Sequence, residues 1–300
     1  MKVLFRADGV NFTDTDFDAA LSRFDLSGKA VLVYSRLLSF GRLTGEDAVK
    51  AMIRVLKRRI GADGTLCIPA YSFSGYNNEV YDPANSKCIV GQLGETARKM
   101  PGFRRTFHPI YSTAVWGRHS KYLLGQDPHS SFGDGSFFEL FSKIKGARIL
   151  FLGTTLSTAT IVHRYDQHCS AKGRFLKNFT AKCLVDGKVS EMQFDSFVKD
   201  YEYYNGRVNC LAPLEVLADN LGIIRREKFA SDWIHMISEK DLRKIYSMFL
   251  LNGMTDYLLS SVTDFQDYYH KNNFLLYRDR VSKKELSRFK KLLNKPTGIS

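Results

Sequence analysis

A histidine and a carboxylate three residues apart are the strongest candidates for chemistry in this chain. His163 and Asp166 lie in TATIVHRYDQHC (158–169), which begins with hydroxyl residues suited to capping and is predicted to be a helix. Because positions i and i+3 share one face of a helix, the carboxylate can fix the tautomer of the imidazole and make it a general base. An exposed His–Asp pair on the helix surface is the alternative interpretation.

A second histidine, His108, lies in FHPIYSTAVWG (107–117), directly before Pro109. Proline disfavours helix at the preceding residue, so His108 is expected in extended backbone, with Ser112 and Thr113 a few residues beyond it. Two interpretations stay open. The histidine belongs to a site, or it is a partly buried side chain bonded to a backbone carbonyl.

Other catalytic patterns are weak. Ser35 and Ser39 have no GxSxG motif around them, and nothing near Cys169 indicates a lowered thiol pKa. HRYDQH is not HExxH, so no metal site is expected. The glycines form neither GxGxxG nor a Walker motif.

The elements that must position these residues follow an α/β pattern. KAVLVYS (29–35), DGTLCIPAYSF (63–73) and ARILFLGTT (147–155) are predicted to be buried strands. EDAVKAMIRVLKRRIG (46–61) has one wide apolar face, and its Gly61 is a natural end for a helix. Strand, helix and strand at this spacing form a right-handed βαβ unit. A loop follows each strand, and in open α/β sheets ligands bind at the carboxyl ends of strands.

The second half of the chain predicts different structure. FTAKCLVDGKVSEMQF (179–194) alternates with a period near two around Asp186-Gly187, which is a hairpin signal. A helix is predicted over 211–222, and helix again from about 231. We therefore expect an α/β fold of three layers, with a mixed central sheet, helices on both faces, an antiparallel β addition and a basic helical C-terminal extension. The expected division is a core of residues 1–230 and an extension of residues 231–300 packed on it.

Composition limits the class of protein. The chain has 300 residues, five cysteines without a CxxC pair and a formal net charge of +13. The cysteine pattern argues against a disulfide framework or a zinc finger. The charge favours an anionic partner, but no nucleic-acid-binding motif is present, so no nucleic acid is expected. No apolar run is long enough to span a bilayer and no signal peptide is evident, so the expected location is the cytoplasm.

Five stretches, in order, resemble the aminoglycoside 3-N-acetyltransferases, also called the antibiotic N-acetyltransferase family. They are VLVYSRLLSFG, DAVKAMIRVLKRRIGADGTLCIPAYSF, RRTFHPIYSTAVWG, SSFGDGSFFELF and ILFLGTTLSTATIVHRYDQ. The resemblance extends over about residues 3 to 225 and differs at Asp166, where the family has a glutamate.

The resemblance implies an enzyme that uses acetyl-CoA as co-substrate to acetylate a sugar amine. It implies His163 as the base, Asp166 as its partner and a less direct part for His108. The residues it implies for co-substrate binding are Ser35, Arg36, Leu37, Ser39, Phe40, Gly41, Tyr71, Ser112 and Thr113. The residues it implies for acceptor binding are Tyr76, Trp116 and Phe132.

The acceptor is expected to be a nucleotide-linked amino sugar that feeds surface-polysaccharide synthesis. The loop GYNNEVYDPANS and the tryptophan of TAVWG resemble relatives encoded with polysaccharide genes, and a basic chain fits a diphosphate better than a polycation. One alternative is an aminoglycoside 3-N-acetyltransferase that confers antibiotic resistance. Another is a non-catalytic protein that binds CoA or a glycan. A homodimer is also considered.

Overall fold

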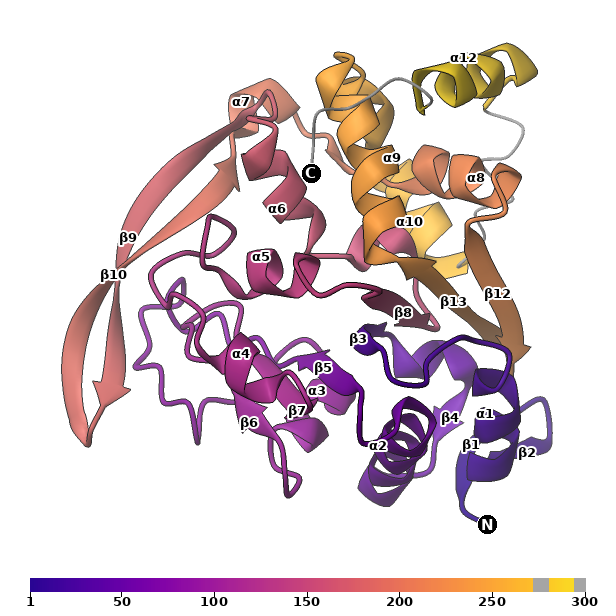
Figure 1. Ribbon diagram of the computed structural model, residues 1–300, viewed down its shortest axis with the longest axis vertical. Helices are drawn as coiled ribbons and strands as arrows, with labels where there is room; N and C mark the ends of the chain where they lie inside the picture. Colours follow the sequence, from indigo (N-terminus) through magenta and orange to yellow (C-terminus); the bar gives the residue numbers. More distant parts are fainter. Residues whose placement is uncertain (272–280, 294–300) are drawn as a thin grey trace.

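A mixed sheet of seven strands forms the centre of the protein, whose computed structural model describes residues 1–271 and 281–293 (Figure 1). From edge to edge the strands are β12 (Ile224–Phe229), β13 (Asp232–Ser238), β8 (Arg148–Leu152), β3 (Ala30–Ser35), β5 (Thr65–Pro69), β7 (Thr113–Gly117) and β6 (Arg104–Arg105). β3 pairs in parallel with β8 and β5, and the outer strands pair antiparallel. The expected mixed sheet is confirmed.

Helices cover both faces of this sheet. One face carries α1 (Asp14–Leu21), α2 (Glu46–Ile60) and α3 (Gln92–Ala97). The other carries α4 (Ser120–Leu124), α5 (Phe137–Ser142), α6 (Val162–His168), α8 (Ala212–Asn220), α9 (Glu239–Leu251), α10 (Val262–Lys271) and α12 (Lys283–Leu293). Along β3, Leu32 packs into the second layer and Val33 into the first, so the strand is apolar on both faces. The three-layer arrangement agrees with the prediction.

The βαβ unit appears as predicted. β3 leads through η1 (Leu37–Phe40) and β4 (Arg42–Leu43) into α2, which ends at Gly61 and returns the chain to β5 beside β3. Acidic residues occupy the first turn of α2 and basic residues the last, which complements the helix dipole. This unit brings the loops after β3 and β5 to one edge of the sheet.

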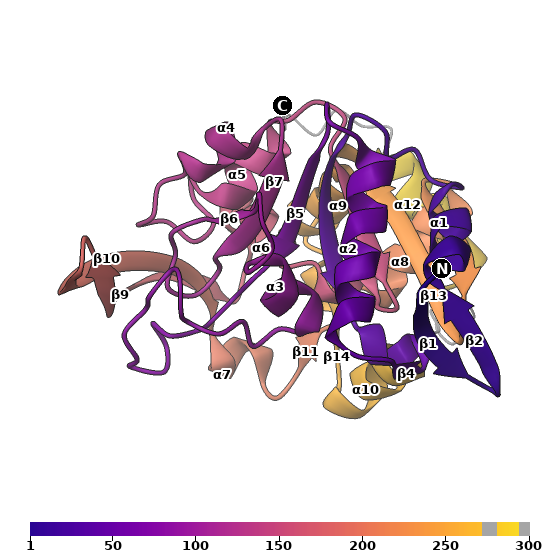
Figure 2. The same cartoon turned by 90° about the horizontal axis from the view of Figure 1, so that it is seen from below.

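The antiparallel addition is a long hairpin of β9 (Arg174–Val185) and β10 (Lys188–Lys199). Asp186 and Gly187 both have positive φ, as a two-residue type I′ turn requires. Figures 1 and 2 show the hairpin reaching away from the body. The remaining elements are β1 (Val3–Ala7), β2 (Val10–Thr13), β11 (Val208–Asn209), β14 (Leu259–Ser260), α7 (Tyr201–Tyr204), η2 (Leu156–Thr158) and η3 (Thr255–Leu258).

The prediction of helix from residue 231 is wrong for its first part. Residues 224–229 and 232–238 form β12 and β13, and β13 pairs with β8 inside the sheet. Ala230, with a positive φ, turns the chain between them without the glycine or asparagine that normally signals a hairpin. The expected boundary at residue 230 therefore falls between two paired strands, and helix begins at Glu239.

In the described ranges, every helix is either too short or too polar to cross a bilayer. The same residues contain no group of three or more histidine, cysteine or carboxylate side chains placed to hold a metal ion.

Candidate active site

The His163–Asp166 pair lies on α6 and faces inward. Nδ1 of His163 is 2.9 Å from Oδ2 of Asp166. Only 3 % of the Asp166 side chain is exposed, against 23 % for His163. The pair is thus a buried carboxylate behind a partly accessible imidazole, and not an exposed ion pair on a helix surface.

Two further side chains hold the carboxylate of Asp166. The hydroxyl of Tyr246, on α9, donates to Oδ1 at 2.8 Å. Nε of Arg174, at the start of β9, lies 3.1 Å from Oδ2. Both oxygens are therefore engaged, which fixes the orientation of the carboxylate toward His163.

These contacts determine the protonation of the pair. Burial alone would raise the pKa of Asp166, but the hydrogen bond with His163 and the charge of Arg174 outweigh it and hold that pKa below its usual value. Burial and the Arg174 charge lower the pKa of His163, against the raising effect of Asp166. At neutral pH the carboxylate is ionised and the imidazole neutral. Since a carboxylate only accepts, Nδ1 carries the proton and Nε2 is the basic atom.

Two cavities meet at His163. The first, of about 440 Å³, lies at the carboxyl ends of β3 and β5 and is lined by Ser35, Tyr71 and Thr160; we call it the strand-end cavity. The second, of about 610 Å³, lies against the hairpin and α7; we call it the hairpin cavity. His163 and Tyr111 line both. Both volumes are typical of small-molecule sites.

Of the residues predicted to bind the co-substrate, Ser35 and Tyr71 line the strand-end cavity. Arg36 lies beside it, since its Nη1 donates at 2.8 Å to the carbonyl of Tyr269, another lining residue. Tyr34, whose hydroxyl accepts from the N–H of Ile161 at 3.1 Å, lines the same cavity and was not predicted.

The rest of the SRLLSFG loop lies outside the cavity walls, because Leu37, Ser39, Phe40 and Gly41 line neither cavity. Leu37 and Phe40 are buried in the layer of α1 and α2. Ser39 Oγ lies 2.8 Å from the carbonyl of Gly153. A Cβ on Gly41 would come within 2.7 Å of a backbone oxygen of β1. These side chains anchor the loop and do not reach the cavity.

His108 lies behind Tyr111 and lines neither cavity. It is 1 % exposed, and its Nδ1 accepts from the N–H groups of Ile110 and Tyr111 at 3.1 Å each. Nε2 donates to Ser131 Oγ at 3.2 Å. Burial lowers the pKa of His108 to about 3, so the ring stays neutral. His108 therefore holds the backbone that presents Tyr111 to both cavities. A direct part in catalysis stays a prediction.

Ser112 and Thr113 also lie outside the cavity walls. Both are completely buried and line neither cavity. Ser112 Oγ accepts from Nε of Arg105 at 2.9 Å and donates to the carbonyl of Ala70 at 2.9 Å. It joins β7 to the end of β5 and is not placed to contact a thioester.

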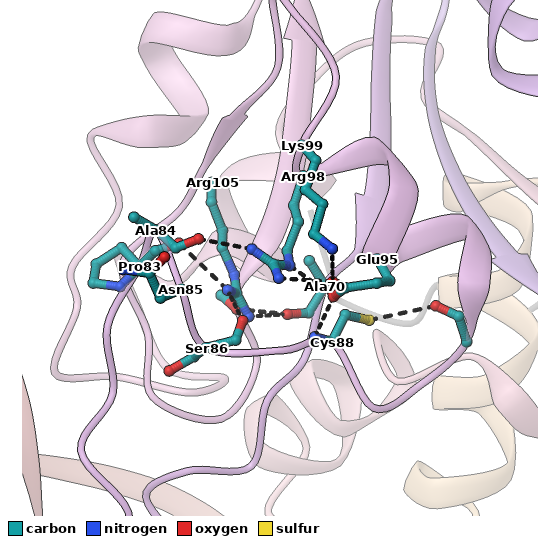
Figure 3. Close-up of polar contacts among 12 residues, drawn as sticks. Ala70, Pro83, Ala84, Asn85, Ser86, Cys88, Glu95, Arg98, Lys99 and Arg105 are labelled. Atoms are coloured by element: carbon teal, nitrogen blue, oxygen red, sulfur yellow. Dashed lines mark hydrogen bonds and ion pairs between the residues drawn. The ribbon is translucent and has the colours of Figure 1, made fainter. Parts of the chain in front are cut away.

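The polar loop over 75–90 is held by arginines (Figure 3). Arg105 donates to the carbonyl of Ser86 at 2.6 Å, and Arg98 donates to that of Ala84 at 2.7 Å. Glu95 accepts from the N–H of Cys88 at 2.7 Å. Burial opposes ionisation of Glu95, but hydrogen bonds from Arg98 and Lys99 prevail and lower its pKa to about 2. This network brings the end of the loop to the strand-end cavity, which Val90 lines.

Two of the three residues predicted for acceptor binding, Tyr76 and Phe132, line the hairpin cavity. Trp116 does not. Alternate residues of β7 point to opposite faces, and Trp116 packs on the α2 side, where Lys57 Nζ lies 4.5 Å from its ring centre.

Comparison with known proteins defines the class of enzyme. A model of the family described as "Aminoglycoside 3-N-acetyltransferase" matches residues 32–248. Aminoglycoside N(3)-acetyltransferase VII of Streptomyces paromomycinus is 27 % identical over 212 residues, covering 63 % of this chain and 71 % of that protein. Aminoglycoside N(3)-acetyltransferase VIII of Streptomyces fradiae is 25 % identical over 248 residues, covering 72 % and 83 %.

Solved structures agree on the fold. Aminoglycoside acetyltransferase AAC(3)-IIb matches with a TM-score of 0.70 at 18 % identity, covering 80 % of this chain and 97 % of that one. A structure titled "AAC-IIIb binary with CoASH" matches with a TM-score of 0.66 at 21 % identity, covering 80 % and 97 %. The protein is therefore an N-acetyltransferase. It belongs to the aminoglycoside 3-N-acetyltransferase family, as the resemblance in its sequence predicted, and the match continues past residue 225 through β12 and β13.

Proposed function

We propose that this protein transfers the acetyl group of acetyl-CoA to an amine of an amino sugar, with His163 as general base. The observation that carries the proposal is that His163 lines both cavities at the point where they meet. A donor thioester in one cavity and an acceptor amine in the other would both face the same Nε2. Such positioning of two reactants is itself a large part of catalysis.

The donor belongs in the strand-end cavity. A CoA donor is supported by the matching fold of "AAC-IIIb binary with CoASH". The cavity lies where α/β sheets bind ligands, and Ser35, Thr160 and Tyr71 give it polar and aromatic walls suited to the amides and methylenes of a pantetheine arm.

The reaction is a direct transfer. The amine nitrogen attacks the thioester carbonyl, His163 Nε2 accepts the proton that the amine loses, and the C–S bond breaks as the C–N bond is completed. The imidazolium, stabilised by Asp166, then returns the proton to the CoA thiolate. No covalent enzyme intermediate is required, because the thioester is already activated.

The relatives' names favour an aminoglycoside as the acceptor, because they are called aminoglycoside N(3)-acetyltransferases. The walls of the hairpin cavity include Tyr76, Phe132 and Tyr201, which suit the faces of sugar rings, and Glu202, which suits an ammonium group.

One observation favours the second candidate, a nucleotide-linked amino sugar for polysaccharide synthesis in the cytoplasm. Lys199 lines the hairpin cavity, and within residues 1–271 and 281–293 no carboxylate is in ion-pair distance of its Nζ, which lies 5.0 Å from the ring centre of Tyr204. Burial lowers the pKa of Lys199. The charge of Asp166 acts on Lys199 and that of Arg174 opposes it, but no ion pair within the described residues neutralises this desolvated cation, so it attracts an anionic group of the ligand. Arg105 and Arg164 do not add to this argument, since they bond to protein oxygens.

The test is release of CoA thiol from acetyl-CoA with two acceptor panels, aminoglycosides and nucleotide-linked amino sugars. We expect His163→Ala to lose about 10²–10⁴-fold in kcat, the contribution of a positioned base, while binding of CoA measured by calorimetry stays near that of the wild type. If His163→Ala turned over at the wild-type rate, the assignment of His163 as general base would be refuted. Absence of turnover on both panels would refute the acceptor class.

A further inference from the structure

Helix α10 lies beyond the family match, which ends at residue 248, yet it completes the strand-end cavity. Tyr269, on its last turn, lines that cavity together with Ser35, Tyr71 and His163. We propose that Tyr269, which lies outside the span that the family model matches, is a co-substrate-binding residue, and that Arg36 and Glu215 are the residues that position it. The inference rests on the proposed function, because it takes the strand-end cavity as the site of acetyl-CoA.

Arg36 joins α10 to the loop after β3. Its Nη1 donates to the carbonyl of Tyr269 at 2.8 Å, and its Nη2 lies 3.1 Å from Nδ1 of His270. The guanidinium carbon is also 4.8 Å from the centre of the Tyr269 ring. One side chain thus fixes both the backbone and the ring of Tyr269. Arg36 therefore contacts a residue of the cavity wall without lining the cavity itself.

Glu215 joins α10 to the opposite wall. The hydroxyl of Tyr268 donates a hydrogen bond to Glu215 Oε2, and the same oxygen accepts from the N–H of Leu156 at 3.4 Å. Leu156 begins η2, whose Thr158 lines the cavity. Glu215 and Tyr268 are both fully buried. The hydrogen bonds that link α10 to η2 through Glu215 are therefore shielded from water.

The charge of Glu215 persists across the physiological range. Burial would raise the pKa of Glu215, but His235 and Arg226 beside it hold that pKa at about 2. Nη2 of Arg226 lies 3.2 Å from Oε1, which leaves Oε2 to Leu156 and Tyr268. The Glu215 end of this link is therefore ionised at neutral pH and accepts from Tyr268.

Tyr269 belongs to the donor side of the site. It lines the strand-end cavity but not the hairpin cavity. Phe265 stacks on its ring at 5.5 Å between centroids, which limits its rotation. A fixed aromatic face beside Ser35 and Thr158 suits a thin ligand with alternating methylene and amide groups, which is the chemistry of the pantetheine arm.

The experiment compares Tyr269→Ala and Tyr269→Phe in the full chain, with Tyr122→Ala as matched control. Tyr122 is 43 % exposed on α4 and lines neither cavity. Calorimetry with CoA gives Kd, and steady-state kinetics at saturating acceptor give KM for acetyl-CoA and kcat. We expect Tyr269→Ala to raise Kd and KM about 10-fold or more, as loss of a buried aromatic contact predicts, and to leave kcat and the KM of the acceptor within about twofold. Tyr269→Phe and Tyr122→Ala should bind CoA like the wild type.

A second variant, Tyr268→Phe, removes the bond to Glu215 and keeps the packing of the ring. We expect faster amide hydrogen exchange over residues 262–271 and a raised KM for acetyl-CoA at unchanged kcat. The inference is overturned if the wild type binds CoA and Tyr269→Ala binds it within twofold. If the wild type fails to bind CoA at all, the proposed function fails first and the inference falls with it, so the two failures are distinct.

Discussion

The imidazole of His163 lies between opposing influences. Burial and the charge of Arg174 favour its neutral form, and the Asp166 carboxylate favours its charged form. The first two prevail and lower its pKa, so the base is available at neutral pH without any change of protonation on binding. A carboxylate that orients a histidine while a nearby cation limits its basicity is a way to match the base to its working pH.

This balance predicts how His163 titrates. We expect its midpoint in the free enzyme to lie below the ordinary value of 6.5, so the ring is neutral at pH 6.5 and above and gains its proton only in more acidic solution. The measurement is NMR titration of the histidine ring protons, with the resonance assigned by its absence in His163→Ala. A midpoint above 6.5 would mean that Asp166 outweighs burial and Arg174.

The variant Asp166→Asn tests the tautomer. The asparagine side chain keeps an oxygen for the Tyr246 hydroxyl but presents an N–H toward Nδ1 of His163, which favours the tautomer with the proton on Nε2 and removes the base. We expect kcat to fall about 10²–10⁴-fold, by analogy with the aspartate-to-asparagine change in serine-protease triads. Loss of the raising effect of Asp166 should also move the His163 midpoint lower. Unchanged kcat would show that another group orients the ring.

The sequence predicted the pair but not its surroundings. His163 and Asp166 are three residues apart on one helix, so periodicity alone brings them together. Arg174 and Tyr246 come from β9 and α9, and no local pattern connects them to α6. The placement of His108 and Trp116 outside both cavity walls could not be predicted for a related reason. Which way a side chain points in a loop or strand depends on neighbours that the local sequence does not identify.

At the scale of elements, the loop after β3 is held by close packing against β8. Gly153, just beyond β8, has φ of +64°, and a Cβ there would lie 2.9 Å from the carbonyl of Arg36 and closer still to Ser39 Oγ. Glycine is therefore required both by the backbone conformation and by the approach of the two loops. Gly153 thus packs the end of β8 against Arg36, the residue that holds α10 through the carbonyl of Tyr269.

We expect Gly153→Ala to destabilise the protein by about 1–3 kcal/mol, the range for overpacking and for a left-handed non-glycine residue. Because the displaced loop carries Ser35 and Arg36, KM for acetyl-CoA should rise as well. Thermal unfolding and kinetics check both effects. Gly125→Ala is the matched control, since its Cβ would meet nothing closer than 3.4 Å, and equal unfolding temperatures for the two variants would contradict the argument.

The elements predicted best are those with an unambiguous period and clear ends. The strand over 30–35, the helix over 46–60 and the hairpin around Asp186-Gly187 agree with the sequence, because each carries its own stop signal. The strands β12 and β13 were missed because the turn between them, at Ala230, contains no glycine or asparagine to signal it. α10 was predicted to be helical, but that it contributes to the cavity follows only from Arg36 and Glu215, whose partners are distant in the chain.

At the scale of the whole molecule, charge distinguishes the two candidate acceptors. The formal net charge is +13, so an approaching polycation is repelled and an anionic sugar is attracted over distances of about a Debye length. Contacts inside the hairpin cavity act at short range and are screened less. Salt therefore acts chiefly on the approach of the acceptor, and the sign of its effect follows the sign of the acceptor's charge.

We expect kcat/KM for an aminoglycoside to rise as ionic strength increases from about 0.01 to about 0.15 M, over which the Debye length falls from about 30 to about 8 Å. For a nucleotide-linked amino sugar it should fall over the same range. Acetyl-CoA, itself an anion, is kept saturating so that its own salt dependence does not enter. A monoamine sugar serves as the weakly charged control and should change least. If kcat/KM for the aminoglycoside falls with salt, the field at the mouth of the hairpin cavity is negative despite the net charge, and Glu202 rather than Lys199 then dominates recognition there.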